Sequence, residues 1–131
     1  MKALVDSLTA KHSAKDLARL YGQDPDQASE AEHPVVRTHD ETGARALYVC
    51  QAFTREFKNW SRQESKVLLD YLYEHCVRPE YQARHQWQTG DLVMWDNRST
   101  LHRGRRFDYS QRRELRPVSY THLTLPTTPY V

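Results

Sequence analysis

Residues 90–113 have the sequence GDLVMWDNRSTLHRGRRFDYSQRR, and this stretch indicates the fold more strongly than any other. A turn around Gly90 precedes four apolar residues, 92–95, which are typical of a buried strand. A second turn is expected at Asp96 and Asn97, followed by a strand that ends at His102. The pattern predicts an imidazole at the rim of a β-sandwich or barrel.

A second group with specific chemistry follows this imidazole. Arg113 lies eleven residues after His102, which is enough chain for a hairpin to return beside it. A metal-binding imidazole next to a guanidinium suits an acidic substrate that chelates the metal at one end. The planar guanidinium can then pair with the distant carboxylate.

Upstream of this stretch the sequence predicts both helices and strands. Ser61 and Glu64 have the spacing of a capping box, and they precede an amphipathic helix that Pro79 is expected to end. Residues 35–38 and 46–49 flank an Asp-Glu-Thr-Gly turn and predict a β-hairpin.

Three further segments have weaker patterns. Residues 3–20 predict helix with a break near His12 and a new start at Ser13. Residues 22–33 predict a loop, and the alternation over residues 81–87 predicts a half-buried strand. The fold class expected from all these elements is mainly β with helices, α+β.

Length and composition limit the possible classes of protein. The chain has 131 residues, which is one ordinary domain, and its 27% charged residues suit a soluble protein. The net charge of +2 is too small to indicate a nucleic-acid-binding protein, and no apolar run approaches the ~18 residues of a membrane span. Residues 1–10 have no secretory pattern, so Cys50 and Cys76 are expected to be reduced cytosolic thiols.

The last fifteen residues, 117–131, differ in amino-acid composition from the rest of the chain. They contain no Asp, Glu, Lys or Arg, although the overall charged fraction of 27% predicts about four, and they hold three of the six prolines. Their amino-acid sequence resembles that of translated sequencing adapters. We expect a non-native tail here, and the alternative is a native Pro/Thr-rich arm.

The motifs of the chain resemble, in order and spacing, those of the taurine dioxygenase/TfdA-like family over about residues 1–116. The signature consists of Trp95-Asp96-Asn97-Arg98-x-Thr100-x-His102 and then Arg113. The matching upstream segments are residues 33–39, 42–43, 46–49, 53–54, 69–72 and 78–82. Members of this family are non-haem Fe(II)- and 2-oxoglutarate-dependent oxygenases.

The resemblance implies a fold and a set of site residues. The fold is a double-stranded β-helix, or jelly roll, whose iron is held by a His-x-Asp pair and a distal histidine. By resemblance His102 is the distal iron ligand, Arg113 binds the C5 carboxylate of 2-oxoglutarate, and Phe53 lines the substrate pocket. The expected partners are dioxygen and a small anionic substrate, and the expected parent enzyme is cytoplasmic and homo-oligomeric, without nucleic-acid or membrane partners.

Two departures from the family pattern matter. None of the seven histidines has Asp two residues later, and the formal His-x-Glu at His39 falls in the predicted hairpin turn, where we expect no iron ligand. The chain therefore resembles a C-terminal portion, residues 1–116, that lacks two of three iron ligands and is inactive alone. Where sulfonate users have a second arginine this chain has Pro117, so sulfonates and aryloxy acids both stay open.

Two other classes of protein compete with the oxygenase. An arginine-rich nucleic-acid-binding module is the first, because seven arginines fall within nineteen residues with Phe107 and Tyr109 among them. The arginines are Arg98, Arg103, Arg105, Arg106, Arg112, Arg113 and Arg116. Asp96, Asp108 and Glu114 dilute this cluster. The second alternative is a non-catalytic jelly-roll scaffold, against which the His102 and Arg113 pair argues.

Overall fold

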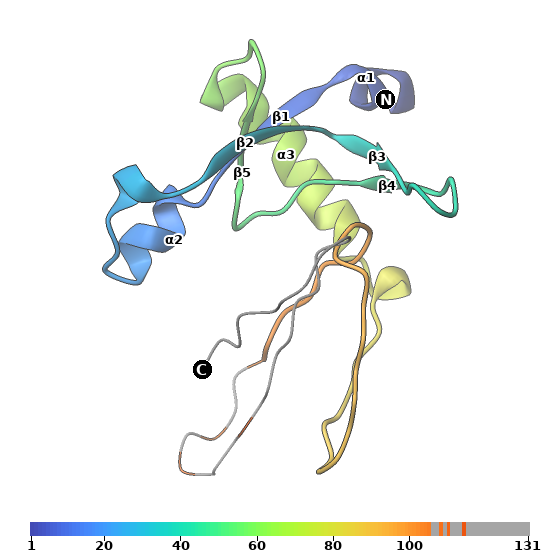
Figure 1. Ribbon diagram of the computed structural model, residues 1–131. Coiled ribbons are helices and arrows are strands. Elements are labelled where there is room, and N and C mark those ends of the chain that lie inside the picture. The colour runs from blue at the N-terminus through green and yellow to red at the C-terminus, as the bar shows by residue number, and fades with distance from the viewer. Residues whose placement is uncertain (106–107, 109, 111–113, 115–131) are drawn as a thin grey trace. The chain divides into compact units, whose positions relative to one another are not determined.

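The computed structural model describes residues 1–105, 108, 110 and 114, and the chain divides into two compact units, Met1–Leu101 and His102–Val131. Helices and strands identified in the described residues all lie in the first unit (Figure 1). They are α1 Lys2–Ser7, β1 Thr9–Ser13, α2 Lys15–Leu20, η1 Pro25–Gln27, β2 Glu30–Pro34, β3 Val36–Thr38, β4 Arg45–Leu47, β5 Thr54–Phe57, α3 Arg62–Cys76 and η2 Pro79–Tyr81. The described residues thus mix helix and sheet, as expected, but they are not mainly β, because the α-helices contain more residues than the strands.

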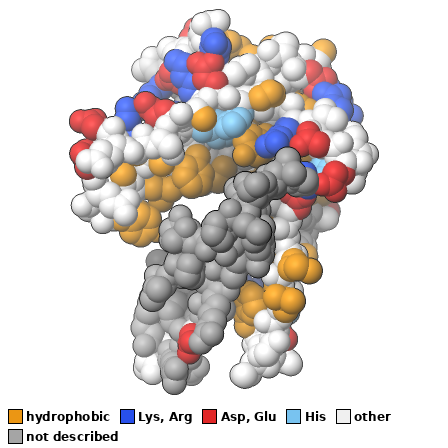
Figure 2. Space-filling view, viewed as in Figure 1, with side chains coloured by type: hydrophobic (Ala, Val, Ile, Leu, Met, Phe, Trp, Pro, Cys, Tyr) orange, Lys and Arg blue, Asp and Glu red, His pale blue; other side chains and the backbone are white. Residues whose placement is uncertain are grey.

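The three-stranded antiparallel sheet has the order β2-β1-β5 and two different faces. In register, Ala10 of β1 lies opposite His33 of β2 and Phe57 of β5, and Ala10 and Phe57 are fully buried. Side chains alternate along a strand, so the neighbours of Ala10 face the other way. The ion pairs on that other face include Lys11–Glu56, Lys15–Glu30 and Lys58–Glu32. Basic and acidic side chains also stand next to one another on the face shown in Figure 2.

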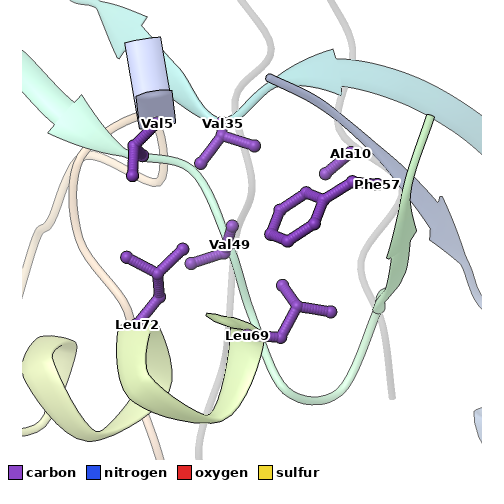
Figure 3. Packing of buried hydrophobic residues seen from close by; sticks show 7 residues of the cluster. All are labelled: Val5, Ala10, Val35, Val49, Phe57, Leu69 and Leu72. Carbon is purple, nitrogen blue, oxygen red and sulfur yellow. The ribbon is translucent and has the colours of Figure 1, made fainter. Parts of the chain in front are cut away.

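The core of the first unit lies between the sheet and α3. Its buried residues are Val5, Ala10, Val35, Val49, Phe57, Leu69 and Leu72. Figure 3 shows the Phe57 ring inside this cluster, with Leu69 and Leu72 reaching it from α3. The cluster therefore brings together residues of α1, β1, β5 and α3 with two connecting segments.

Helix α3 begins where the capping box predicts it. The Ser61 hydroxyl accepts a hydrogen bond from the Glu64 amide at 3.2 Å, and the Glu64 carboxylate accepts one from the Ser61 amide at 2.8 Å. One turn later Ser65 is fully buried, and its hydroxyl accepts a hydrogen bond from the Phe57 amide at 3.0 Å. Ser65 thereby joins the helix to the end of β5, a contact that sequence reasoning missed.

Replacing Ser65 by alanine should destabilise the protein by about 1–3 kcal/mol, because the Phe57 amide would stay buried without an acceptor. Urea denaturation of the variant and the parent chain measures the difference. The exposed Ser29→Ala is the control and should change stability by less than about 0.5 kcal/mol. Equal stability of the Ser65 variant and the parent would show that this hydrogen bond contributes nothing.

The hairpin predicted around residues 35–49 is confirmed. β3 and β4 pair antiparallel with Val36 opposite Leu47, and the turn between them closes with a 2.8 Å hydrogen bond from the His39 amide to the Ala44 carbonyl. Gly43 has a φ of +69°, a left-handed conformation that glycine adopts without strain. Cys50 and Cys76 are both free thiols, as expected, and burial raises the pKa of Cys76.

The interpretation of residues 3–33 is wrong in two places. The expected helix 3–20 is divided by β1, and the loop expected over residues 22–33 contains the start of β2. Both segments pair across the sheet, and this pairing overrides weak local helix and loop patterns. Ser13 ends β1 instead of beginning a helix, and α2 starts at Lys15 with Ala14 as its N-cap.

The strands predicted over residues 81–87, over residues 92–95 and up to His102 are absent from the described part of the chain. Leu92 and Met94 are 83% and 85% exposed, so the segment 92–95 is not buried. A strand exists only where a neighbouring strand pairs with it, and no described residue pairs with these segments. The turns between them are confirmed, with Gly90 at a φ of +93° in the first.

No helix in the described residues is long and apolar enough to cross a membrane.

Three aromatic rings meet on the core face of the sheet. His12 lies 5.3 Å from His33 and 5.7 Å from Tyr48, measured between ring centroids. The His12 Nδ1 atom lies 3.4 Å from the Thr54 hydroxyl, while its Nε2 atom is buried without a hydrogen-bond partner among the described residues. Burial, and after it the neighbouring His33, lowers the pKa of His12.

This lowered pKa predicts acid destabilisation. The unfolded chain binds a proton at His12 more readily than the folded chain, so stability increases with pH in the range between the two pKa values. The contribution is fully present above the unfolded value of about 6.5 and is lost as the pH falls toward the lower folded value. The free energy of unfolding between pH 8 and pH 5 should show this slope. The variant His12→Phe should have a smaller slope, and an unchanged slope would contradict the assignment to His12.

Candidate functional site

The turn at residues 96–100, which carries the sequence Asp-Asn-Arg-Ser-Thr, is closed by Asp96. The Asp96 carbonyl accepts hydrogen bonds from the amides of Ser99 and Thr100, at 3.2 and 2.9 Å. Its side chain accepts a further one from the Arg98 amide at 2.8 Å. One residue therefore fixes the backbone of the turn through both its carbonyl and its carboxylate.

The Asp96 carboxylate also makes a contact with a residue 57 positions earlier. His39 Nε2 lies 2.8 Å from Asp96 Oδ2, and the His39 side chain is only 11% exposed. The other ring nitrogen of His39, Nδ1, accepts hydrogen bonds from the amides of Glu41 and Thr42, both at 3.3 Å. Because Nδ1 accepts, the ring proton belongs on Nε2, which donates to Asp96. Both nitrogens are thus engaged, and neither is available to a metal.

Arg98 completes this group of charges. Its Nε and Nη2 atoms donate to the Asp96 carboxylate at 3.0 and 2.7 Å, and Nη2 also lies 3.4 Å from Glu41. The hydrogen bond from the Arg98 side chain, and after it the one from His39, holds the pKa of Asp96 well below its usual value. The same carboxylate raises the pKa of Arg98. Asp96 is therefore a stable anion that joins the turn 96–100 to the β3–β4 hairpin.

The three residues that the resemblance assigns to the site lie in different parts of the chain. His102 is exposed and is the first residue of the second unit, two residues after the turn ends at Thr100. Phe53 lies in the first unit, in the turn before β5, and is 41% exposed. Arg113 lies outside the described residues. The structure thus describes Phe53 and His102 in separate units and leaves their assigned roles as predictions.

A metal site needs several donor atoms that converge. Among the described residues, no group of three or more His, Cys, Asp and Glu side chains could hold a metal ion. His102 is the one described residue that the resemblance assigns to iron, and a single imidazole gives the metal one bond. The described residues alone therefore do not fit an iron site, and no catalytic step is derived from them.

Sequence reasoning did not predict the contact between His39, Asp96 and Arg98, although all three lie within motifs that carry the resemblance. His39 belongs to the segment 33–39, and Asp96 and Arg98 belong to the signature 95–102. The sequence therefore contained a signal for both motifs, since each is a short polar segment at the end of an expected hairpin strand. Nothing in their spacing indicated that the two turns touch.

Comparison with known proteins supports the family that these motifs indicate. The sequence model described as "Taurine catabolism dioxygenase TauD, TfdA family" matches residues 1–118. The chain is 41% identical over 124 residues to the alpha-ketoglutarate-dependent 2,4-dichlorophenoxyacetate dioxygenase of Cupriavidus pinatubonensis, covering 88% of this chain and 42% of that protein. It is 48% identical over 73 residues to an alkylsulfatase of Acinetobacter baylyi, covering 56% of this chain and 23% of that protein.

Solved structures give the same result. The crystal structure of AAD-2 in complex with Mn(II) and N-oxalylglycine matches with a TM-score of 0.77 and 34% identity, covering 86% of this chain and 47% of that one. A taurine dioxygenase from Burkholderia xenovorans matches with a TM-score of 0.56 and 37% identity, covering 68% and 29%. The chain spans less than half the length of these relatives. Because the family model matches nearly all of it, the chain belongs to the TauD/TfdA family of dioxygenases.

Proposed function

We propose that this chain is the C-terminal portion of an Fe(II)- and 2-oxoglutarate-dependent dioxygenase that hydroxylates a small organic anion. The observation that carries the proposal is the family match over residues 1–118, which includes both His102 and Arg113. Iron supplies the oxidative chemistry with dioxygen and 2-oxoglutarate once its full ligand set is present. The remaining ligands come from a portion of the protein that precedes the matched region.

Each assigned residue has a separate task. In this proposal His102 would be an iron ligand, and Arg113 would bind the far carboxylate of 2-oxoglutarate through charge-assisted hydrogen bonds. Phe53 lines the substrate side of the pocket.

The fold proposed for the whole domain, residues 1–116 with the preceding portion, is a double-stranded β-helix. The exposure of Leu92 and Met94 supports this, because apolar residues in an extended segment need a partner sheet to cover them. In the proposal, strands of the preceding portion pair with residues 81–87 and 92–95. In the proposal residues 117–131, of which only the first two fall within the family match, are a non-native tail.

The substrate class rests on the relatives. Their names include a 2,4-dichlorophenoxyacetate dioxygenase, an alkylsulfatase and a sulfate ester dioxygenase, whose substrates are all small organic anions. An aryloxy acid, an alkyl sulfate and a sulfonate therefore all belong in the test. A nucleic-acid-binding module has less support, because Arg98, one of its seven arginines, already pairs with Asp96 and Glu41.

A chimera tests the proposal. Residues 1–116 replace the matching segment of the Cupriavidus pinatubonensis dioxygenase, and this protein is called the chimera below. With Fe(II), 2-oxoglutarate and dioxygen it should form succinate in the presence of at least one of the three anions. Succinate formation should require both the metal and the organic anion. A chimera that is folded by circular dichroism and gel filtration but forms no succinate with any of them would overturn the proposal.

A further inference from the structure

We propose that a cavity on the ion-pair face of the first unit, the sheet face opposite the core, binds a small doubly charged oxyanion such as sulfate or hydrogen phosphate. The cavity has a volume of about 280 Å³ and is formed by residues of β1, α2, β2, β5 and the first turn of α3. All of its lining residues lie between positions 11 and 62, within the first unit. The site therefore needs neither iron nor any residue of the second unit.

A β-bulge in β5 directs two consecutive side chains into this cavity. β1 pairs with β5 at Lys11–Glu56 and at His12–Thr54, so Arg55 has no residue opposite it. In a regular strand the side chains of neighbouring residues point to opposite faces of the sheet. Arg55 and Glu56 nevertheless both line the cavity. Bulges re-aim side chains in this way and are frequent next to active sites.

Arg55 is a fixed part of the cavity wall. Its Nη2 and Nη1 atoms donate to the carbonyls of Ala52 and Gln51, at 2.6 and 3.3 Å. Its Nε atom lies 3.1 Å from Asp16 Oδ2, and the side chain is 17% exposed. The Arg55 guanidinium thus joins α2 to the turn before β5. A site whose wall is held in place loses little entropy when a ligand binds.

The described residues that line the cavity carry two more positive charges than negative charges. The basic residues are Lys11, Lys15, Arg19, Arg55 and Arg62. The acidic residues are Asp16, Glu30 and Glu56. A hydrogen bond from Lys15 lowers the pKa of Glu30, and one to Glu56 raises the pKa of Lys11, so these groups stay ionised at neutral pH.

The excess charge arises because two of the carboxylates are shared. Asp16 forms ion pairs with both Arg19 and Arg55. Glu56 forms ion pairs with both Lys11 and Arg62. A dianion in the cavity would balance the two charges that the carboxylates leave, whereas a monoanion would balance only one of them. Complementary charge of this kind gives a site its specificity.

The two lysines also keep donors for a ligand. Lys11 Nζ donates to Glu56 and Lys15 Nζ donates to Glu30, both at 2.9 Å. An ammonium group has three N–H donors, and these are the hydrogen bonds that the structure gives the two groups among the described residues. Each lysine can therefore donate to an oxyanion without leaving its carboxylate. Such charge-assisted hydrogen bonds are roughly twice as strong as neutral ones.

The first experiment titrates the whole chain with sodium sulfate and with sodium phosphate in a calorimeter, at a constant ionic strength of about 0.15 M. Both anions should bind at one saturable site with a Kd of roughly 1 mM, as expected for about three hydrogen bonds to charged groups. Sodium chloride at equal ionic strength should give no saturable signal. Absence of saturable binding of both sulfate and phosphate to the folded chain would overturn the proposal.

The second experiment breaks one ion pair of the cavity from either side. Lys15→Met should weaken sulfate binding about tenfold, because it removes a charge and a donor. Glu30→Gln breaks the same pair but removes a negative charge, so it should strengthen binding by about threefold. A purely structural effect would change the affinity in the same direction in both variants. That result, or unchanged affinity in Lys15→Met, would contradict the assigned site.

The matched control is Lys58→Met. Lys58 forms an ion pair with Glu32 on the same face of the sheet, but it does not line the cavity. Its removal should change sulfate affinity by less than about twofold, because charges outside the site are screened by salt. A loss as large as that of Lys15→Met would show that sulfate responds only to the overall charge of the chain. The thermal midpoint of each variant shows that it is folded.

Two methyl esters test the charge and the source of the anion at about pH 8, where methyl phosphate is a dianion and methyl sulfate a monoanion. Methyl sulfate should bind at least about tenfold more weakly than hydrogen phosphate, and equal affinity would overturn the match to a double charge. Methyl phosphate that binds like hydrogen phosphate would identify a site for the end group of an organic ester. Methyl phosphate that binds about tenfold more weakly would identify a site for the free ion.

Discussion

His102→Ala in the chimera should abolish both Fe(II) binding and succinate formation, and excess 2-oxoglutarate should restore neither. The proposed role of His102 is that of an iron ligand, and metal affinity depends on the complete donor set, so removal of one imidazole leaves the site too weak to hold iron. Iron content after anaerobic desalting measures the first effect, and succinate measures the second.

Two further measurements distinguish the loss of an iron ligand in His102→Ala from misfolding of the variant. Circular dichroism and the thermal midpoint of His102→Ala should match those of the chimera, since the side chain is exposed and lies outside the core cluster in the chain. Retention of bound iron and of succinate formation in His102→Ala would show that the ligand lies elsewhere.

Arg113→Ala should act on the cosubstrate and leave the iron in place. Loss of a bidentate, charge-assisted contact to a carboxylate costs about 2–5 kcal/mol, which is roughly a 30- to 4000-fold rise in the KM for 2-oxoglutarate. Arg113→Lys should recover only part of the affinity, because an ammonium group cannot form the planar fork. KM for 2-oxoglutarate and iron content are measured on the same preparations.

Arg106→Ala is the control for this variant, since it removes a neighbouring arginine of the same sequence cluster and should change KM little. If Arg106→Ala raises KM steeply while Arg113→Ala binds 2-oxoglutarate normally, the carboxylate-binding arginine has been assigned to the wrong position.

The parts of the fold that follow from local chemistry could be predicted from the sequence. Helix α3 has both halves of its capping box and an apolar face, and the β3–β4 hairpin has a Thr-Gly turn between two apolar runs. In each case the residues that define the element contact one another within a few positions. Such signals are complete within a short window of sequence.

The remaining elements depend on contacts between distant residues. β1 carries Lys11 and His12 in a segment with a weak helical pattern, yet it forms the centre of the sheet because two strands pair with it. Residues 92–95 are the reverse case. Their sequence pattern strongly favours a strand, yet no described residue pairs with them. A strand depends on its neighbour, and a sequence pattern cannot supply one.

The candidate site shows the same division. The motifs around His39 and Asp96 could be located from their order and spacing, and they led to the family that the comparisons support. The hydrogen bond between the two residues could not be predicted, because 57 positions separate them. Each motif is also fully explained as a turn that needs no contact with the other. Only the structure indicates that the hairpin turn and the turn 96–100 act as one unit.

The most direct test of the central claim is the visible absorption of Fe(II) and 2-oxoglutarate under anaerobic conditions, recorded for this chain alone and for the chimera. Chelation of protein-bound Fe(II) by 2-oxoglutarate gives a metal-to-ligand charge-transfer band. We expect no band for the chain alone, because one expected ligand cannot hold iron, and a clear band for the chimera that disappears in His102→Ala. A band from the chain alone, or a folded chimera without one, would contradict the claim that this chain supplies one ligand and the carboxylate-binding arginine of a larger site.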